Sequence, residues 1–214
     1  MAEDVVVSAN TTAALARELG EVGRSCPPRG QRQNRDREIY CLRRYLLTLS
    51  SADLLTFPIV VRKSETPDFI FECKGTVLFG LEHTDATDPA DQQEMDAASK
   101  LERPWMQGEF GGQGGDGFVG DKPEYLWLSY IVNAIQVKKQ KAYRTADTRL
   151  LLYSNSNAGG HEGADDAFHI IVAHLRKNPE VIICGTKKFE VSIIKGDSLL
   201  HDVGEDAHLL PLRC

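Results

Sequence analysis

The chain has 214 residues, of which 42% are hydrophobic and 26% are charged, as in an ordinary globular domain with a sizeable core. Its net charge of −6 argues against indiscriminate binding to nucleic acid, and no apolar run of about 18 residues is present to span a membrane. The N-terminus has neither the basic nor the apolar region of a signal peptide. We therefore expect a cytoplasmic protein without a membrane partner.

Two helices are expected in the N-terminal part of the chain. The first covers about residues 9–22, and the prolines at 27 and 28 end its pattern, so residues 1–30 are predicted to form an N-terminal helix and a linker. The second covers residues 34–49, where an apolar stripe recurs at helical spacing. Three short strands are expected next, at residues 57–61, 67–71 and 77–84, and Lys74-Gly75 predicts a turn that joins the last two as a hairpin.

The second half of the chain begins with an acidic and then glycine-rich segment at about residues 85–122, which is predicted to be an inserted flexible loop. After it we expect a helix at 125–143, a strand at 150–153, a helix from Asp165 or Asp166 to about residue 178, and strands at 181–184 and 189–194. The pattern predicts one α/β domain with a central mixed β-sheet flanked by helices, a core at residues 31–195 and an undetermined tail at 196–214.

Two acidic residues stand at corresponding ends of the predicted hairpin. Asp68 begins its first strand and Glu82 lies near the end of its second strand, so pairing of the strands would bring the two carboxylates together. Convergent carboxylates on strands suit a hard divalent cation, Mg²⁺ or Mn²⁺. Glu38 lies at the margin of the apolar face of the helix at 34–49, where it is either a third metal-binding carboxylate or a solvated surface residue.

The hairpin also carries a resemblance to a known family. The segments Glu65-Thr66-Pro67-Asp68-Phe69 and Gly80-Leu81-Glu82-His83-Thr84 resemble the Pro-Asp…(Asp/Glu)-x-Lys motif of the restriction-endonuclease-like nuclease superfamily. The order of elements from Asn34 to Tyr153 is similar to the core of that superfamily, and the resemblance covers about residues 34–195. It implies a restriction-endonuclease-like fold, Asp68 and Glu82 as metal ligands, and hydrolysis of phosphodiester bonds in nucleic acid, DNA rather than RNA, with pairing of two copies into a homodimer.

The sequence departs from the motif at Thr84, which stands where the superfamily has its lysine. Members of the superfamily can carry this lysine on the following helix, and Lys138 lies on the apolar stripe of the helix predicted at 125–143. Lys138 is therefore predicted to be either the displaced catalytic lysine or a lysine whose charged end reaches solvent past apolar neighbours. Thr84 shares the sheet face of Glu82 and could position a water, whereas His83 points to the other face and is expected to be packed.

Basic residues near the predicted site are candidates for contacts with phosphates. They are Arg35, Arg43, Lys139, Lys141 and Arg144, and their alternative role is to form solvated helix faces. Two other functions remain open beside the nuclease. One is a member of the same fold without catalysis that binds nucleic acid or protein, and the other is an interaction protein that uses the glycine-rich loop.

Overall fold

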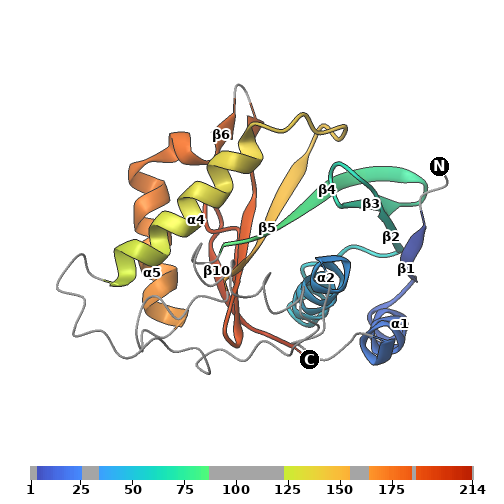
Figure 1. Ribbon diagram of the computed structural model, residues 1–214. Coiled ribbons are helices and arrows are strands. Elements are labelled where there is room, and N and C mark those ends of the chain that lie inside the picture. The colour runs from blue at the N-terminus through green and yellow to red at the C-terminus, as the bar shows by residue number, and fades with distance from the viewer. Residues whose placement is uncertain (1–3, 26–33, 87–122, 155–163, 185–186, 214) are drawn as a thin grey trace, which may run out of the picture.

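A computed structural model describes residues 4–25, 34–86, 123–154, 164–184 and 187–213. Within these ranges the chain forms an eight-stranded mixed sheet with helices on both faces (Figure 1). The predicted α/β architecture with a central mixed sheet flanked by helices is confirmed. None of the helices in the described ranges is long and apolar enough to cross a membrane. The segment 85–122, predicted to be an inserted loop, lies outside the described residues except for its first two positions.

The first half of the sheet is antiparallel. Strands β1, β2, β3 and β4 pair in that order, and the helices α1 and α2 come between β1 and β2 in the chain. The turn between β3 and β4 consists of Lys74 and Gly75, both with positive φ, which suits a tight two-residue hairpin and confirms the predicted hairpin. The elements are β1 (Val5–Ala9), α1 (Thr12–Ser25), α2 (Asn34–Ser51), β2 (Ile59–Lys63), β3 (Phe69–Cys73) and β4 (Thr76–Asp85).

The second half of the sheet starts with parallel strands. β5 lies parallel to β4, β8 lies parallel to β5, and β9 and β10 continue antiparallel to the far edge. A short separate hairpin, β6–β7, stands beside the sheet. The elements are α4 (Pro123–Lys139), β5 (Thr148–Ser154), α5 (Ala164–Lys177), the 3-10 helix η2 (Pro179–Val181), β6 (Ile183–Cys184), β7 (Lys187–Lys188), β8 (Val191–Lys195), β9 (Ser198–His201) and β10 (His208–Pro211).

Three local predictions differ from the structure. Strand β1 was not expected, because a short edge strand is defined by its partner β2 more than by its own pattern. The segment 181–184 is a strand only at its last two residues, since Pro179 begins a 3-10 turn that suits its fixed φ and missing N–H. The undetermined tail at 196–214 contains β9 and β10, which complete the sheet.

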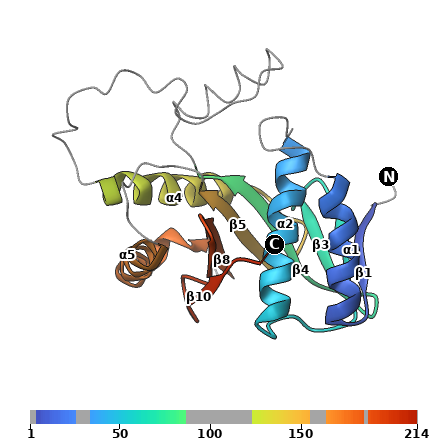
Figure 2. The same ribbon diagram turned by 90° about the horizontal axis from the view of Figure 1, so that it is seen from below.

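The core has two apolar layers, one on each face of the sheet. Leu151 packs in the layer under α1 and α2, whereas its neighbours Leu150 and Leu152 pack in the layer under α4 and α5. Figure 2 shows the two helix pairs on opposite sides of the sheet. Because both faces of β5 are covered, its sequence Leu-Leu-Leu is a continuous apolar run instead of an alternating one.

Gly80 in β4 lies at the closest approach between this strand and the loop that carries Asp68. A β-carbon at Gly80 would stand 2.2 Å from Pro67 Cγ and 2.5 Å from Thr145 Oγ1. Both distances are far below van der Waals contact, and the proline ring cannot rotate away. Glycine at this position therefore allows the loops that begin β3 and β5 to close over β4.

We expect Gly80→Ala to lower the free energy of unfolding by about 1–3 kcal/mol, because the added methyl must displace Pro67 or Thr145. Urea denaturation followed by circular dichroism measures this change. Gly20→Ala is the matched control: this glycine lies in α1 with nothing within 4 Å of the added carbon. It is expected to stabilise the helix by up to about 1 kcal/mol. Equal effects of the two substitutions would contradict the close approach at Gly80.

Candidate active site

The centre of the candidate site is the buried carboxylate of Glu82 on β4. Its neighbour Leu81 faces α1 and α2, so strand alternation turns Glu82 toward α4. The Glu82 side chain is 1% exposed, and its Oε1 accepts hydrogen bonds from Lys138 Nζ at 2.6 Å and from Lys141 Nζ at 2.7 Å. A buried carboxylate requires such partners, because removal from water without them costs several kcal/mol.

Lys138 reaches Glu82 from the last turn of α4, on the face that also carries buried Ile131 and Ile135. The Lys138 side chain is 14% exposed, and its ammonium donates a second hydrogen bond to the backbone oxygen of His83 at 3.0 Å. Helical periodicity predicted Lys138 on the apolar stripe of this helix, and in the structure its ammonium group reaches the Glu82 carboxylate. The charged end of Lys138 therefore points into the site, and the alternative in which it reaches solvent does not describe this geometry.

Lys141 lies in the turn after α4, which is a correction to the predicted helix at 125–143. The helix ends at Lys139 because the carbonyl oxygen of Lys138 is taken by two later donors, the Lys141 amide at 3.1 Å and the Tyr143 hydroxyl at 3.0 Å. Leaving the helix frees the Lys141 side chain to turn back to Glu82. The hydrogen bond to Glu82 is the main cause of a raised pKa for the Lys141 ammonium, so this group is charged at neutral pH.

Asp68 lies directly beside Glu82. The β3–β4 register pairs Phe69 with Leu81, so Asp68, which immediately precedes β3, lies at the same end of the hairpin as Glu82. Asp68 Oδ2 accepts a hydrogen bond from the backbone amide of His83 at 2.8 Å. Burial raises the pKa of the Asp68 carboxyl, and the negative charges of Glu82 and Glu38 raise it further. The two carboxylates proposed from the hairpin thus come together and repel one another.

The third predicted carboxylate, Glu38, is linked to Asp68 by Lys63, a residue that the sequence did not indicate. Glu38 on α2 forms an ion pair with Lys63 at the end of β2, with Oε2 and Nζ 2.6 Å apart, and Lys63 Nζ stands 3.7 Å from Asp68 Oδ1. Lys63 therefore separates Glu38 from Asp68. The signal for it in the sequence is a charged residue that ends the apolar strand Ile-Val-Val-Arg-Lys, which is too common to be diagnostic.

His83 occupies the opposite face of β4, as predicted. Its side chain is buried, with Nε2 at 3.7 Å from Asp85 Oδ1, and Asp85 in turn pairs with Arg37 on α2 at 2.9 Å. Burial, together with the positive charges of Lys138, Arg37 and Lys63, lowers the pKa of His83 to about 3. The imidazole is therefore neutral at physiological pH and serves the site through its backbone, which binds Asp68 and Lys138. Thr84 is half-buried on the face of Glu82.

The carboxylates of the site match in part the ligands that proteins provide for a divalent cation. Among the residues that the structure describes, no three His, Cys, Asp or Glu side chains form a group that could hold a metal ion. Mg²⁺ is, however, usually held by one or two protein carboxylates together with waters and substrate phosphates. Glu82 Oε2 is buried and has no hydrogen-bond partner within the described ranges, which leaves one oxygen available beside Asp68. Asp68 and Glu82 fit such a two-carboxylate site, and Glu38 is engaged by Lys63.

The five basic residues predicted to contact phosphates do not gather in one place. Lys139 and Lys141 stand together at the end of α4, where Lys139 Nζ donates to the Glu180 carbonyl at 2.6 Å. Arg144 follows in the exposed part of the same connection, and Arg35 is exposed in the first turn of α2. Arg43 packs between the two N-terminal helices, where its Nε donates to the Leu19 carbonyl at 2.9 Å. Of these five residues, Lys141 is the one whose contact with a carboxylate of the site is observed, at Glu82.

Replacing Asp68 by asparagine is expected to raise the melting temperature at about pH 7, and the gain should shrink toward about pH 4. The pKa of this carboxyl is raised from its ordinary 3.8, so the folded state holds the proton more tightly than the unfolded state. The stability contributed by the group is thus full below pH 3.8 and is lost as the pH rises through the raised pKa. Asparagine carries no charge and keeps an oxygen for the His83 amide.

Thermal unfolding in a series of buffers measures this difference. Asp53→Asn is the matched control, because Asp53 is exposed and asparagine tolerates its positive φ. His83 has the opposite pH dependence, since its lowered pKa removes stability as the pH falls below 6.5, but it is present in both proteins and cancels in the comparison. A destabilised Asp68→Asn variant at neutral pH would refute burial and repulsion as the dominant effects at this position.

Comparisons with protein-family models, with curated proteins and with solved structures give no match for this chain. Its function therefore has to be argued from the chemistry of the site itself.

Proposed function

We propose that the protein is a Mg²⁺- or Mn²⁺-dependent nuclease that hydrolyses phosphodiester bonds in nucleic acid, with DNA as the favoured substrate. Asp68 and Glu82 hold the metal ion, and Lys138 replaces the lysine that the family motif would place at Thr84. The observation that carries the proposal is the hydrogen bond of 2.6 Å between Lys138 Nζ and Glu82 Oε1, with Asp68 bound to the amide of the next residue, His83, at 2.8 Å. A buried acid pair with a lysine from the next helix is the combination that this chemistry requires.

Each side chain of the site has a separate role in the proposed reaction. A bound Mg²⁺ would supply polarisation of the phosphate and a lower pKa for the attacking water. Lys138 is held by Glu82 and the His83 carbonyl, and its fixed ammonium stabilises negative charge that develops on the phosphate. Thr84, on the same face of β4, orients a water through its hydroxyl. Lys141 is 45% exposed and can leave Glu82 to follow a phosphate.

The topology around the site supports the same proposal. The order α2, β2, β3, β4, α4, β5, with β2–β4 antiparallel and β5 parallel to β4, has the helix, three strands, helix and strand of the restriction-endonuclease-like core. Asp68 immediately precedes the second of these strands, Glu82 lies on the third, and the lysine lies on the helix that follows. We include this fold assignment, and a homodimer able to act on two strands, in the proposal.

A second candidate is a nucleic-acid-binding protein of the same fold without catalysis. It is favoured by the engagement of Glu82 Oε1 with two lysines, which balances the buried charge without any cation. Thr84 in place of the motif lysine points the same way. In this reading Lys138 and Lys141 stabilise the fold, and the basic residues after α4 contact phosphates.

Cleavage of single- and double-stranded DNA and RNA by the purified chain separates these functions. With Mg²⁺ or Mn²⁺ we expect cleavage that EDTA abolishes and that Asp68→Asn and Lys138→Met each reduce at least about 100-fold, as expected for loss of a group that stabilises the transition state. Asp53→Asn, an equivalent change at an exposed position, should retain full activity. Circular dichroism of every variant shows whether the fold is kept.

Each result that contradicts the nuclease also bears on the second candidate function. Binding of nucleic acid without cleavage, unaffected by Asp68→Asn and by EDTA, would reject the nuclease and support the second candidate. Cleavage that persists in Asp68→Asn would place the active site elsewhere in the chain. Absence of both binding and cleavage would reject both functions.

A further inference from the structure

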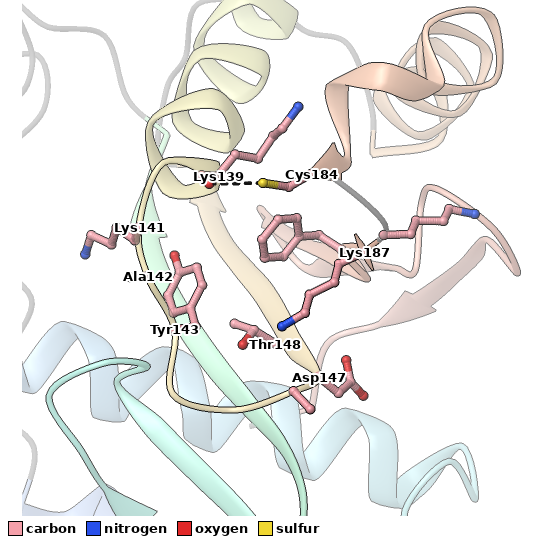
Figure 3. Close-up of a pocket in the computed structure, with 11 residues that line it drawn as sticks. Lys139, Lys141, Ala142, Tyr143, Asp147, Thr148, Cys184 and Lys187 are labelled. Atoms are coloured by element: carbon pink, nitrogen blue, oxygen red, sulfur yellow. Dashed lines mark hydrogen bonds between the residues drawn. The ribbon is translucent and has the colours of Figure 1, made fainter.

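A cavity of about 250 Å³ lies next to the carboxylate site, between the connection from α4 to β5 and the β6–β7 hairpin (Figure 3). It is smaller than the pockets of about 300–1,000 Å³ that hold drug-sized ligands, and its size suits a phosphate group with part of a sugar. Its lining combines lysines with an aromatic wall. Of these lining residues, Lys141 also contacts the proposed metal site.

The lining of the cavity contains more cationic than anionic side chains. Its lining contains four lysines and one carboxylate, Asp147. Lys139 and Lys141 stand at the rim, where their ammonium groups bind the Glu180 carbonyl and Glu82. Such an excess of cations around a small concave space attracts an anion and resists a cation.

Lys187 is the cation best placed to bind a ligand. The β6–β7 register sets it opposite Cys184, whose Sγ lies 3.5 Å from the Lys139 carbonyl oxygen, so Lys187 shares the face of the hairpin that looks toward α4. The next residue, Lys188, alternates to the other face and pairs with Glu205 at 3.2 Å. Lys187 forms no ion pair with any residue in the described ranges. Its three donors are therefore available to a bound group.

The aromatic wall is fixed in place. Tyr143 and Phe189 meet edge to face with ring centroids 6.1 Å apart, and Phe189 is buried. The Tyr143 hydroxyl donates to the Lys138 carbonyl at 3.0 Å, which holds the ring against the end of α4. Figure 3 shows Tyr143, Thr148 and Lys187 around a common space. An immobilised ring beside a cation is the usual arrangement for a nucleotide, because the ring contacts sugar or base while the cation binds phosphate.

Lys141 connects the cavity to the carboxylate site. It lines the cavity, and its Nζ stands 2.7 Å from Glu82 Oε1. Burial, together with the negative charges of Glu82 and Asp68, raises the pKa of the Tyr143 hydroxyl. A ligand in the cavity is therefore a close neighbour of any group bound at Asp68 and Glu82.

We propose that this cavity binds a phosphate group of a nucleic-acid strand, with Lys187 as its main cation, Lys139 and Lys141 at its rim and Tyr143 against the adjoining sugar or base. The identity of the strand as substrate or product rests on the proposed nuclease function. The bound phosphate neighbours the one that is hydrolysed, so the cavity positions the strand across the carboxylates.

Titration of the full ¹⁵N-labelled chain in EDTA tests the cavity without any need for catalysis. The probes are thymidine 5′-monophosphate, inorganic phosphate and uncharged thymidine. We expect the monophosphate to bind most tightly and thymidine not to bind, with the largest amide shifts at Cys184, Phe189 and Tyr143. Affinity should fall as salt is added, because the attraction is electrostatic.

Lys187→Glu should weaken binding of the monophosphate at least about tenfold, since a hydrogen bond to a charged group is lost and a repulsion is gained. Lys177→Glu makes the same change of charge at an exposed lysine at the end of α5 that does not line the cavity, and should change the affinity by less than about twofold. Lys187→Gln, which only neutralises the charge, serves as the test if Lys187→Glu does not fold.

The outcomes separate this inference from the proposed function. Loss of binding in the Lys187 variants supports the cavity even where the wild-type chain cleaves nothing. Equal weakening by Lys177→Glu, or amide shifts away from the cavity, would overturn the site although cleavage is observed. Inorganic phosphate binding as tightly as the monophosphate would overturn the assignment to a nucleic-acid strand and favour free phosphate as the ligand.

Discussion

The buried carboxylate of Glu82 sets the geometry of the whole site. A carboxylate that is 1% exposed must be matched by cations, and Lys138 and Lys141 supply them at 2.6 and 2.7 Å. These ion pairs hold the end of α4 over β4. They also draw the connection that follows the helix back toward Glu82. The ion pairs at Glu82 orient the side chains of Lys138 and Lys141, and the hydrogen bonds to the Lys138 carbonyl end the helix between them.

The network leaves charge unevenly distributed. Positive charge gathers on the α4 side of Glu82, whereas Asp68 faces Glu82 and Glu38 with Lys63 as its nearest cation, at 3.7 Å. A fold selected for stability alone would not place two partly or fully buried carboxylates close enough to repel one another. Such arrangements are typical of functional sites, where stability is given up for reactivity or binding. The physical cost at Asp68 is therefore itself an argument for function.

Local pattern predicted the parts of this site that depend on local geometry. Strand alternation and the Lys74-Gly75 turn were enough to bring Asp68 to Glu82, and helical periodicity was enough to aim Lys138 at the sheet. Lys141 could not be placed, because the end of α4 depends on the Tyr143 hydroxyl and on Glu82 itself. Lys63 could not be placed either, since its partner Glu38 is brought to it by the packing of α2 on the sheet. The positions of Lys141 and Lys63 therefore both depend on contacts between residues that are far apart in the sequence.

The same charge distribution explains why the cavity and the carboxylate site belong together. Lys138 and Lys141 repel a divalent cation at Glu82, and Lys141 competes with it for the same carboxylate. In the proposed nuclease, a phosphate near the end of α4 would offset this repulsion and offer Lys141 another partner, so the nucleic-acid strand would strengthen cation binding at Asp68 and Glu82. By reciprocal coupling the cation strengthens binding of the strand. Under the proposed function the site would assemble on its substrate, with the protein supplying two carboxylates and the nucleic acid supplying the remaining oxygen ligands.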